Sequence, residues 1–196
     1  MGNVNKTYRR IVIKIGSNVL TNKEGLPDLA VLKSLVTQIV KTKQQGIQVI
    51  IVSSGAVAAG KSIYKTRGKI GTIAQKQLFA ALGQVKLMEH YNNFFKAENF
   101  LCAQVLVTKE DFRDRKHYLN MKNCLNVLLE NQIIPIVNEN DVISVTELMF
   151  TDNDELAGMI ATMLKVYALL VMSNVYGVYD GDPSLEISNI IKTFSG

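Results

Sequence analysis

The stretch IQVIIVSSGAVAAGKS, residues 47–62, contains the transition that decides the fold. Residues 47–52 form a continuous apolar run rich in isoleucine and valine, which is typical of a strand buried on both faces of a sheet. Ser53-Ser54-Gly55 then marks a turn, and the small residues that follow Gly55 favour a helix. A buried strand that leads through a glycine turn into a helix predicts a βα unit.

The same alternation of strand and helix runs along the rest of the chain. Further strands are expected at residues 10–15, 101–107, 133–137 and 168–172, and Pro135 is discordant within its strand. One helix is expected between the N-terminal cap Asp28 and the C-terminal stop Gly46, and two more at residues 72–96 and 118–131. A further helix is expected to open with Asp152-Asn153-Asp154 and to extend to Leu164. A hairpin is expected at residues 142–150. This order predicts an α/β fold, a three-layer αβα sandwich with a largely parallel central sheet.

Apolar residues three or four positions apart predict which face of each helix packs on the sheet. After Asp28 this stripe consists of Leu32, Leu35, Val36, Ile39 and Val40. In the long helix at 72–96 the stripe consists of Leu78, Leu82, Val85 and Met88, and Gly83 is expected to allow close packing. In the helix at 118–131 it consists of Met121, Cys124, Leu125 and Leu128.

Composition excludes several classes of protein. The chain has 196 residues, a net charge of +5 and 47% hydrophobic residues, which predicts one globular domain over residues 1–196. Cys102 and Cys124 have no metal-ligand spacing, so we expect two reduced buried thiols and no metal-ligand site. No apolar run has the length of a membrane helix and the N-terminus lacks a secretory signal, so we expect a cytoplasmic protein. The small positive charge does not require a nucleic acid as partner.

Residues 55–62, GAVAAGKS, also fit the phosphate-binding loop G-x-x-x-x-G-K-[ST]. In that interpretation Lys61 would reach the phosphates and Ser62 would hold Mg²⁺. The inner residues favour a helix rather than a cradling loop, however, and a partner carboxylate at the end of another apolar strand is hard to find, since residues 168–172 lead to Ser173-Asn174. We therefore favour the alternative, in which Gly55 makes the turn, a helix starts at Ala56, and Gly60 ends or packs it.

Polar clusters follow the predicted strands, and ligands of open α/β sheets bind beyond the carboxyl ends of the strands. Lys14 lies in the first strand, where an ammonium group is costly unless it meets an anion. The clusters are Gly16-Ser17-Asn18, Ser53-Ser54-Gly55, Asn138-Glu139-Asn140-Asp141 and Ser173-Asn174. Asp152-Asn153-Asp154 exceeds what a helix cap needs and has the chemistry to orient an ammonium group or a magnesium-bound phosphate. Considered one at a time, each of these features also has a purely structural explanation. Lys14 could be an edge-strand lysine that reaches solvent, and the polar clusters could be a tight turn, a solvated turn or a helix cap.

Six segments together resemble a known family. VIKIGSNVL, IVSSGAVAAG, AQKQLFAALGQ, AQVLVT, PIVNENDVIS and FTDNDELAG occur in the order found in the amino acid kinase family. The similarity extends from about residue 9 to residue 183, and NEND and TDND combined with SGAVAAG are most similar to its glutamate 5-kinases. The resemblance implies transfer of phosphate from ATP, with Mg²⁺, to the side-chain carboxylate of L-glutamate, which is the first step of proline synthesis.

The resemblance also implies roles for individual residues. Lys14 resembles the lysine that stabilises the transferred phosphate, and Asp154 resembles the aspartate that organises the catalytic lysines. The residues that resemble glutamate contacts are Ser54, Gly55, Asn138, Asp141, Asp152 and Asn153. The residues expected to meet ATP are Lys14, Gly16, Ser17, Ser173 and Asn174. The resemblance assigns no catalytic role to Lys61, and it implies a homo-oligomer and proline as a feedback inhibitor.

Two departures from the family pattern leave alternatives open. Ser173-Asn174 stands where the family commonly has Thr-Asp, so we expect altered contact with the nucleotide. The glycine-rich segment with a second catalytic lysine is absent, so we expect the domain to be incomplete in its C-terminal nucleotide half, with an exposed apolar edge there and weak or no activity. The alternatives are a non-catalytic glutamate-binding or regulatory subunit, and another amino acid kinase.

Overall fold

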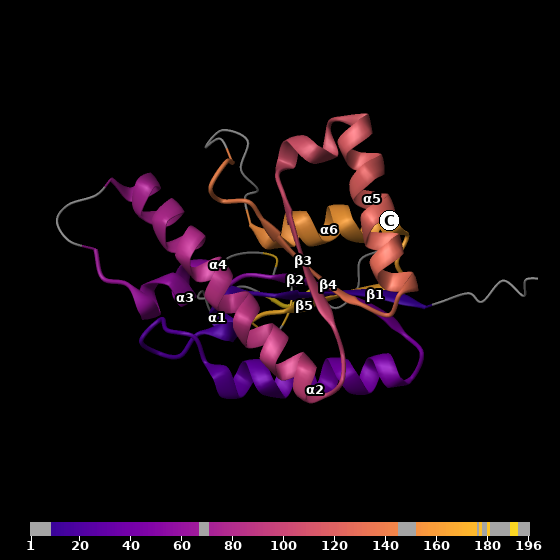
Figure 1. Ribbon diagram of the computed structural model, residues 1–196, viewed down its shortest axis with the longest axis horizontal. Helices are drawn as coiled ribbons and strands as arrows, with labels where there is room; N and C mark the ends of the chain where they lie inside the picture. The colour runs from indigo at the N-terminus through magenta and orange to yellow at the C-terminus, as the bar shows by residue number, and fades with distance from the viewer. Residues whose placement is uncertain are drawn as a thin grey trace, which may run out of the picture.

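The computed structural model describes residues 9–66, 71–144, 152–175, 177, 180 and 189–191. Its elements follow each other in the predicted alternation (Figure 1). They are β1 (Arg10–Ile15), α1 (Ser17–Leu20), α2 (Leu29–Gln44), β2 (Gln48–Ser53), α3 (Ala56–Ile63), α4 (Thr72–Ala97), β3 (Cys102–Val107), the 3₁₀ helix η1 (Lys109–Phe112), α5 (Arg115–Glu130), β4 (Ile134–Glu139), α6 (Asn153–Leu164) and β5 (Ala168–Met172).

The five strands form one parallel sheet in the order β3-β4-β2-β1-β5. β1 lies between β2 and β5, so that Lys14 is in register with Val52 on one side and Val171 on the other. All strands therefore end at the same edge of the sheet. The predicted parallel sheet is confirmed.

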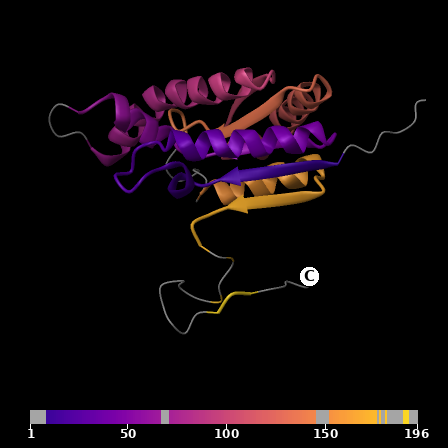
Figure 2. The same ribbon diagram turned by 90° about the horizontal axis from the view of Figure 1, so that it is seen from below.

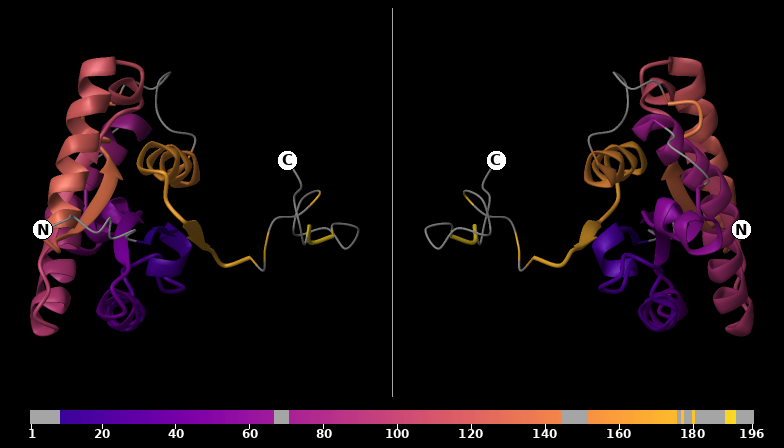
Figure 3. Two further views of the ribbon diagram at one scale, coloured as in Figure 1. Left: turned by 90° about the vertical axis from the view of Figure 1, so that its right-hand side faces the viewer. Right: turned by 90° about the vertical axis from the view of Figure 1, so that its left-hand side faces the viewer.

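Helices cover both faces of the sheet, which gives the three predicted layers (Figure 3). Alternate residues of each strand enter two separate cores, as the period of a strand requires. Ile11, Ile13 and Ile15 of β1 pack with α2 and α4, whereas Val12 packs with α5 and α6. By the same alternation Lys14 lies on the α6 side. The side-chain period of β1 thus directs this lysine toward the N-terminus of α6.

The predicted apolar stripe of α2 is confirmed, because all five of its residues are buried. The stripe predicted for α4 is wrong, since Leu82 and Val85 are exposed, the latter by 73%. The buried stripe lies one residue further along the helix and consists of Phe79, Ala80, Gly83, Leu87, Tyr91 and Phe95. Close approach to α3 at Gly83 decides which side of α4 faces inward.

In α5 the buried residues are Met121, Leu125 and Leu129, and Cys124 is exposed. The prediction of two buried thiols is therefore wrong for Cys124. Cys102 is half-buried in β3, and its burial raises the pKa of the thiol to about 11. Both cysteines are free thiols, as expected.

Helices α3 and α4 cross where two glycines remove the side chains between them. A Cβ added at Gly60 would lie 2.0 Å from the carbonyl oxygen of Phe79, and one added at Gly83 would lie 1.7 Å from that of Ala56. α3 starts directly after Gly55, and Lys61 is exposed on its last turn. GAVAAGKS is therefore a turn and a helix with a packing glycine, as we favoured over the phosphate-binding loop.

Several boundaries differ from the predicted ones. β4 extends to Glu139, so that Asn138 and Glu139 belong to the strand and are buried. Pro135 is tolerated because the pairing of β4 with β2 begins only at Ile136. The short elements α1 and η1 were not predicted, and most of the hairpin predicted at 142–150 lies outside the described residues. None of the described helices is long and apolar enough to span a membrane.

Candidate active site at the carboxyl edge of the sheet

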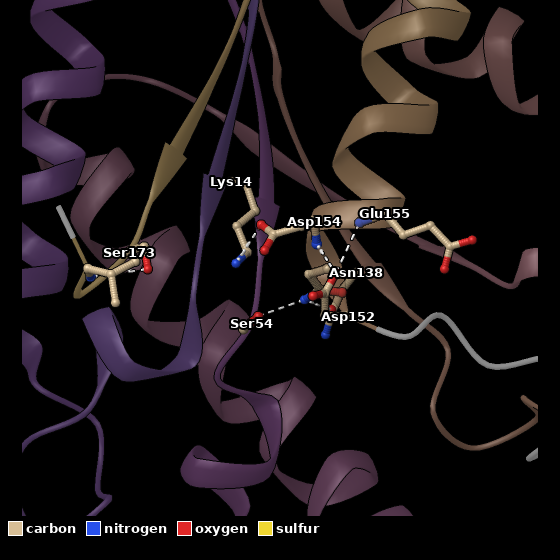
Figure 4. Close-up of polar contacts among 9 residues, drawn as sticks. Lys14, Ser54, Asn138, Asp152, Asp154, Glu155 and Ser173 are labelled. Atoms are coloured by element: carbon tan, nitrogen blue, oxygen red, sulfur yellow. Dashed lines mark hydrogen bonds and ion pairs between the residues drawn. The ribbon is translucent and has the colours of Figure 1, made fainter. Parts of the chain in front are cut away.

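The carboxyl ends of β2 and β4 and the N-terminus of α6 enclose a cleft of about 300 Å³. Five segments distant in the sequence contribute its polar side chains, and Figure 4 shows those of Ser54, Asn138 and Asp152. Of the residues predicted to contact glutamate, all six line this cleft: Ser54, Gly55, Asn138, Asp141, Asp152 and Asn153. The structure thus brings this predicted group together.

Lys14 pairs with Asp154 across the edge of the sheet. Its Nζ lies 2.7 Å from Asp154 Oδ1, and only 10% of the lysine side chain is exposed, against 47% for the aspartate (Figure 4). An ammonium group in this strand was expected to meet an anion, because a buried, unpaired charge is costly. Asp154 is that anion, and it fixes the direction of the lysine side chain.

Asp152 is the N-cap of α6. Its Oδ1 accepts hydrogen bonds from the backbone N–H groups of Asp154 (2.8 Å) and Glu155 (3.1 Å). Such a cap satisfies two of the free donors of the first turn. A structural role therefore accounts for one oxygen of Asp152, and the residue still lines the cleft.

The turn after β2 supplies the opposite wall. Gly55 has φ of 104°, a left-handed conformation that side chains disfavour, and it directs the chain into α3. The backbone N–H of Ser54 donates to the carbonyl oxygen of Ile15 (3.0 Å), and this bond joins the ends of β1 and β2. Below the turn, Ser53 and the fully buried Tyr91 share a hydrogen bond of 2.8 Å, and burial raises the pKa of Tyr91. The turn is therefore anchored from both sides.

Two charged side chains of the cleft were not among the predicted site residues. Lys76 comes from α4, and its Nζ lies 2.9 Å from Asp141 Oδ1 at the cleft. Glu139 is buried at the end of β4 and also lines the cleft. The segment AQKQLFAALGQ carried part of the family resemblance, and this was the signal that pointed to α4. No local pattern placed Lys76 opposite Asp141.

A smaller cleft of about 140 Å³ adjoins the first one. Among the residues lining it are all five that were predicted to meet ATP: Lys14, Gly16, Ser17, Ser173 and Asn174. A Cβ added at Gly16 would lie 3.4 Å from Lys14 Nζ and 3.3 Å from the carbonyl oxygen of Met172. The glycine therefore leaves space beside the ammonium group. Ser17, Ser54, Asp152 and Asn153 line both clefts, so the two form one continuous site.

The sequence profile of the amino acid kinase family matches residues 9–194. The chain belongs to the amino acid kinase family. A crystal structure of UMP kinase from Ureaplasma parvum resembles it with a TM-score of 0.57 at 18% identity, over 88% of this chain and 73% of that one. This likeness supports the family's fold and, at such low identity, nothing more specific.

Relatives within the amino acid kinase family are more similar in sequence. A glutamate 5-kinase of Bacteroides thetaiotaomicron is 49% identical over 94% of this chain and 51% of its own length. A glutamate 5-kinase of Chlorobaculum tepidum is 50% identical over 100% of this chain and 55% of its own. Glutamate 5-kinase 2 of Bacillus subtilis is 45% identical over 90% of this chain and 48% of its own length. The chain thus spans about half the length of these curated relatives.

Proposed function

We propose that this chain forms the glutamate-binding half of an ATP-dependent glutamate 5-kinase, which makes L-glutamyl 5-phosphate for proline synthesis. The observation that carries the proposal is the shared wall of the two clefts. One cleft is rich in carboxylate and amide groups, and the other contains Lys14 beside a glycine. An acceptor in the first and a phosphate in the second would meet at Ser17, Ser54, Asp152 and Asn153.

The larger cleft offers complementary groups for L-glutamate. In this proposal Glu139 and Asp141 would attract its α-ammonium group, and Asp141 would share its charge between that group and Lys76. Ser54 and the N-terminus of α3 offer hydrogen-bond donors and a positive dipole to a carboxylate. The proposal places the γ-carboxylate of glutamate there, facing Lys14.

The transfer needs positioning more than proton chemistry. A γ-carboxylate oxygen forms a bond to the γ-phosphorus, the bond from that phosphorus to the bridging oxygen breaks, and ADP leaves with the electron pair. The carboxylate is already ionised at neutral pH, so no general base is required. Lys14, fixed by Asp154, supplies positive charge beside the developing negative charge.

Mg²⁺ is part of the same proposal. Bound to ATP, it would neutralise phosphate charge. Carboxylate oxygens suit this ion, and Asp152 places one at the wall shared by the two clefts. Among the described residues no group of three or more His, Cys, Asp or Glu side chains is placed to hold a metal ion. The protein groups would therefore assist a magnesium ion that the phosphates carry.

Three further expectations belong with this proposal. A homo-oligomer is supported by exposed apolar side chains on α4, on β3 and directly before β3, namely Leu82, Val85, Leu106 and Leu101. Proline shares the backbone groups of glutamate and would compete in the larger cleft. We also propose a cytoplasmic location, which would give the enzyme access to ATP.

The test combines binding and turnover. Calorimetry measures L-glutamate binding to the 196-residue chain, and hydroxylamine traps the acyl phosphate while ADP release is followed. Lys14→Ala should lower turnover by more than about 100-fold, because a charge aimed at the transition state is lost. Lys61→Ala, in an exposed lysine of α3, is the matched control and should leave turnover unchanged.

The opposite pattern in the two lysine variants would overturn the proposal. Absence of any glutamate binding by the chain would overturn it as well. Glutamate binding without trapped acyl phosphate would instead favour the alternative of a non-catalytic glutamate-binding subunit.

A further inference from the structure

Helix α4 contributes to the site a side chain whose role the proposed function does not cover. Gln84 Oε1 lies 3.0 Å from Asn138 Nδ2 and accepts its hydrogen bond. Gln84 Nε2 is buried and has no hydrogen-bond partner among the described residues. A buried amide donor without a partner costs about 1–3 kcal/mol and calls for an explanation.

The bond from Asn138 to Gln84 is the first of a relay that ends at the cleft. Asn138 Oδ1 accepts a hydrogen bond from Asn153 Nδ2 (3.2 Å), and Asn153 Nδ2 also donates to Ser54 Oγ (2.8 Å). The relay therefore joins α4, β4, α6 and the turn after β2. Figure 4 shows the last part of it, from Asn138 to Ser54.

The relay has a direction, and that direction sets the chemistry of Ser54. Because Ser54 Oγ accepts from Asn153, its own O–H remains free to donate, which suits an anionic carboxylate in the cleft. In the reverse direction Gln84 would donate to Asn138, and Asn138 would donate to Asn153. The Ser54 hydroxyl would then donate to the Asn153 carbonyl and would be lost to a ligand.

We propose that Gln84 is a positioning residue: by accepting from Asn138 it holds Asn138, and through it Asn153, in the arrangement that leaves the Ser54 hydroxyl available as a donor to the substrate carboxylate. The inference rests on the proposed function, because it needs glutamate in the larger cleft. With Asn138 as its partner, the Gln84 amide leaves one of its two polar atoms unpaired in either orientation, and the orientation with Oε1 toward Asn138 is the one that serves the site.

The packing of α4 explains how Gln84 reaches Asn138. Gly83, its neighbour, lies against the backbone of α3 so closely that a Cβ would meet the Ala56 carbonyl oxygen at 1.7 Å. This close approach brings the next side chain to the end of β4, where Asn138 is only 4% exposed. The crossing of two helices thus positions a group for the site.

The test compares variants of Gln84 in calorimetric binding of L-glutamate to the full chain. Gln84→Met keeps the length but removes the acceptor, and it should weaken binding by about tenfold, the value of one hydrogen bond. Gln84→Glu keeps an acceptor for Asn138 and removes the unpaired amide donor. This variant should bind L-glutamate with an affinity within about threefold of that of the unmodified chain. Asn92→Met, an exposed amide on the same helix, is the matched control and should not change binding.

A double-mutant cycle separates positioning from mere packing. Ser54→Ala removes the hydroxyl on which Gln84 acts, so Gln84→Met should cost less than about threefold in that background. A packing defect would lower affinity equally in both backgrounds. If Gln84→Met does not fold, Gln84→Asn, whose shorter amide cannot reach Asn138, takes its place.

The outcomes distinguish the two proposals. If the unmodified chain binds no L-glutamate, the proposed function fails and this inference fails with it. If the chain binds L-glutamate but Gln84→Met binds equally well, or the losses at Gln84 and Ser54 are additive, only the role of Gln84 is overturned.

Discussion

Lys43, near the C-terminal end of α2, keeps its ammonium group in an apolar setting. The residue is 6% exposed, and its Nζ has no hydrogen-bond partner among the described residues. The ring of Phe100 lies beneath it, with Nζ 6.0 Å from the ring centroid. Burial lowers the pKa of Lys43 from its ordinary value of 10.5, because desolvation disfavours the charged form. This lysine therefore opposes folding at neutral pH.

Replacement of Lys43 by methionine should raise the free energy of unfolding by about 1–2 kcal/mol at pH 7. The unfolded chain binds the proton more tightly than the folded one, so the stability of the unmodified protein rises as the pH increases through the lowered pKa toward 10.5. The advantage of Lys43→Met should accordingly shrink at pH 10. Urea unfolding at the two pH values measures it.

Lys41→Met is the control for this prediction, since Lys41 lies on the same helix and is exposed. It should change the free energy of unfolding by less than about 0.5 kcal/mol at either pH. An equal gain from both substitutions would show that hydrophobicity of the helix, rather than relief of a buried charge, is responsible.

At the scale of the element, the crossing of α3 and α4 supports the site. These helices hold Gly55 at the cleft and Gln84 against Asn138, and their backbones touch where Gly60 and Gly83 lack side chains. Packed interiors transmit such a contact because they contain little free space. Separating the helices should therefore disturb both stability and ligand binding.

Gly83→Ala should lower the free energy of unfolding by about 3 kcal/mol or more and weaken L-glutamate binding, because its Cβ would overlap the backbone of α3. Gly158→Ala in α6 is the matched control. A Cβ there meets nothing within 4 Å, so that alanine should stabilise the helix by about 0.5–1 kcal/mol. Thermal unfolding and calorimetry measure both effects, and similar results for the two glycines would contradict the role of the crossing.

At the scale of the whole molecule, the edge strand β5 is the least covered part of the sheet (Figure 2). Leu170, Val171 and Met172 are exposed by 45%, 48% and 37%, respectively. The predicted exposed apolar edge is therefore confirmed. Unpaired strand edges with apolar side chains promote association between chains.

We therefore expect the 196-residue chain to associate as its concentration rises, and Leu170→Lys to reduce that association, because a charge on an edge strand disfavours pairing. Val127→Lys, on α5, changes a side chain of similar exposure, 46%, away from the edge and should leave association unchanged. Sedimentation velocity over a concentration series distinguishes the two. Equal behaviour of both variants would place the associating surface elsewhere.

The sequence by itself determined the strands, the described helices other than the short α1 and η1, and the parallel sheet. These depend on the period of apolar residues, on caps such as Asp28 and Asp152 and on the turn at Gly55, all of which act within a few residues. It also placed the predicted site residues at one edge of the sheet, because parallel strands end together. The resemblance to the amino acid kinases then indicated a role for each of them.

Only the tertiary structure decided which side of α4 packs inward and which of its side chains reach the cleft. The hydrogen bond between Ser54 and Asn153 joins residues 99 positions apart, and the bond between Gln84 and Asn138 spans 54. Such contacts depend on strand order and on how closely two helices cross. The spacing of apolar residues along the sequence contains no information on strand order or on the distance between two helices. The contributions of Lys76, Glu139 and Gln84 to the site therefore became apparent only in the folded chain.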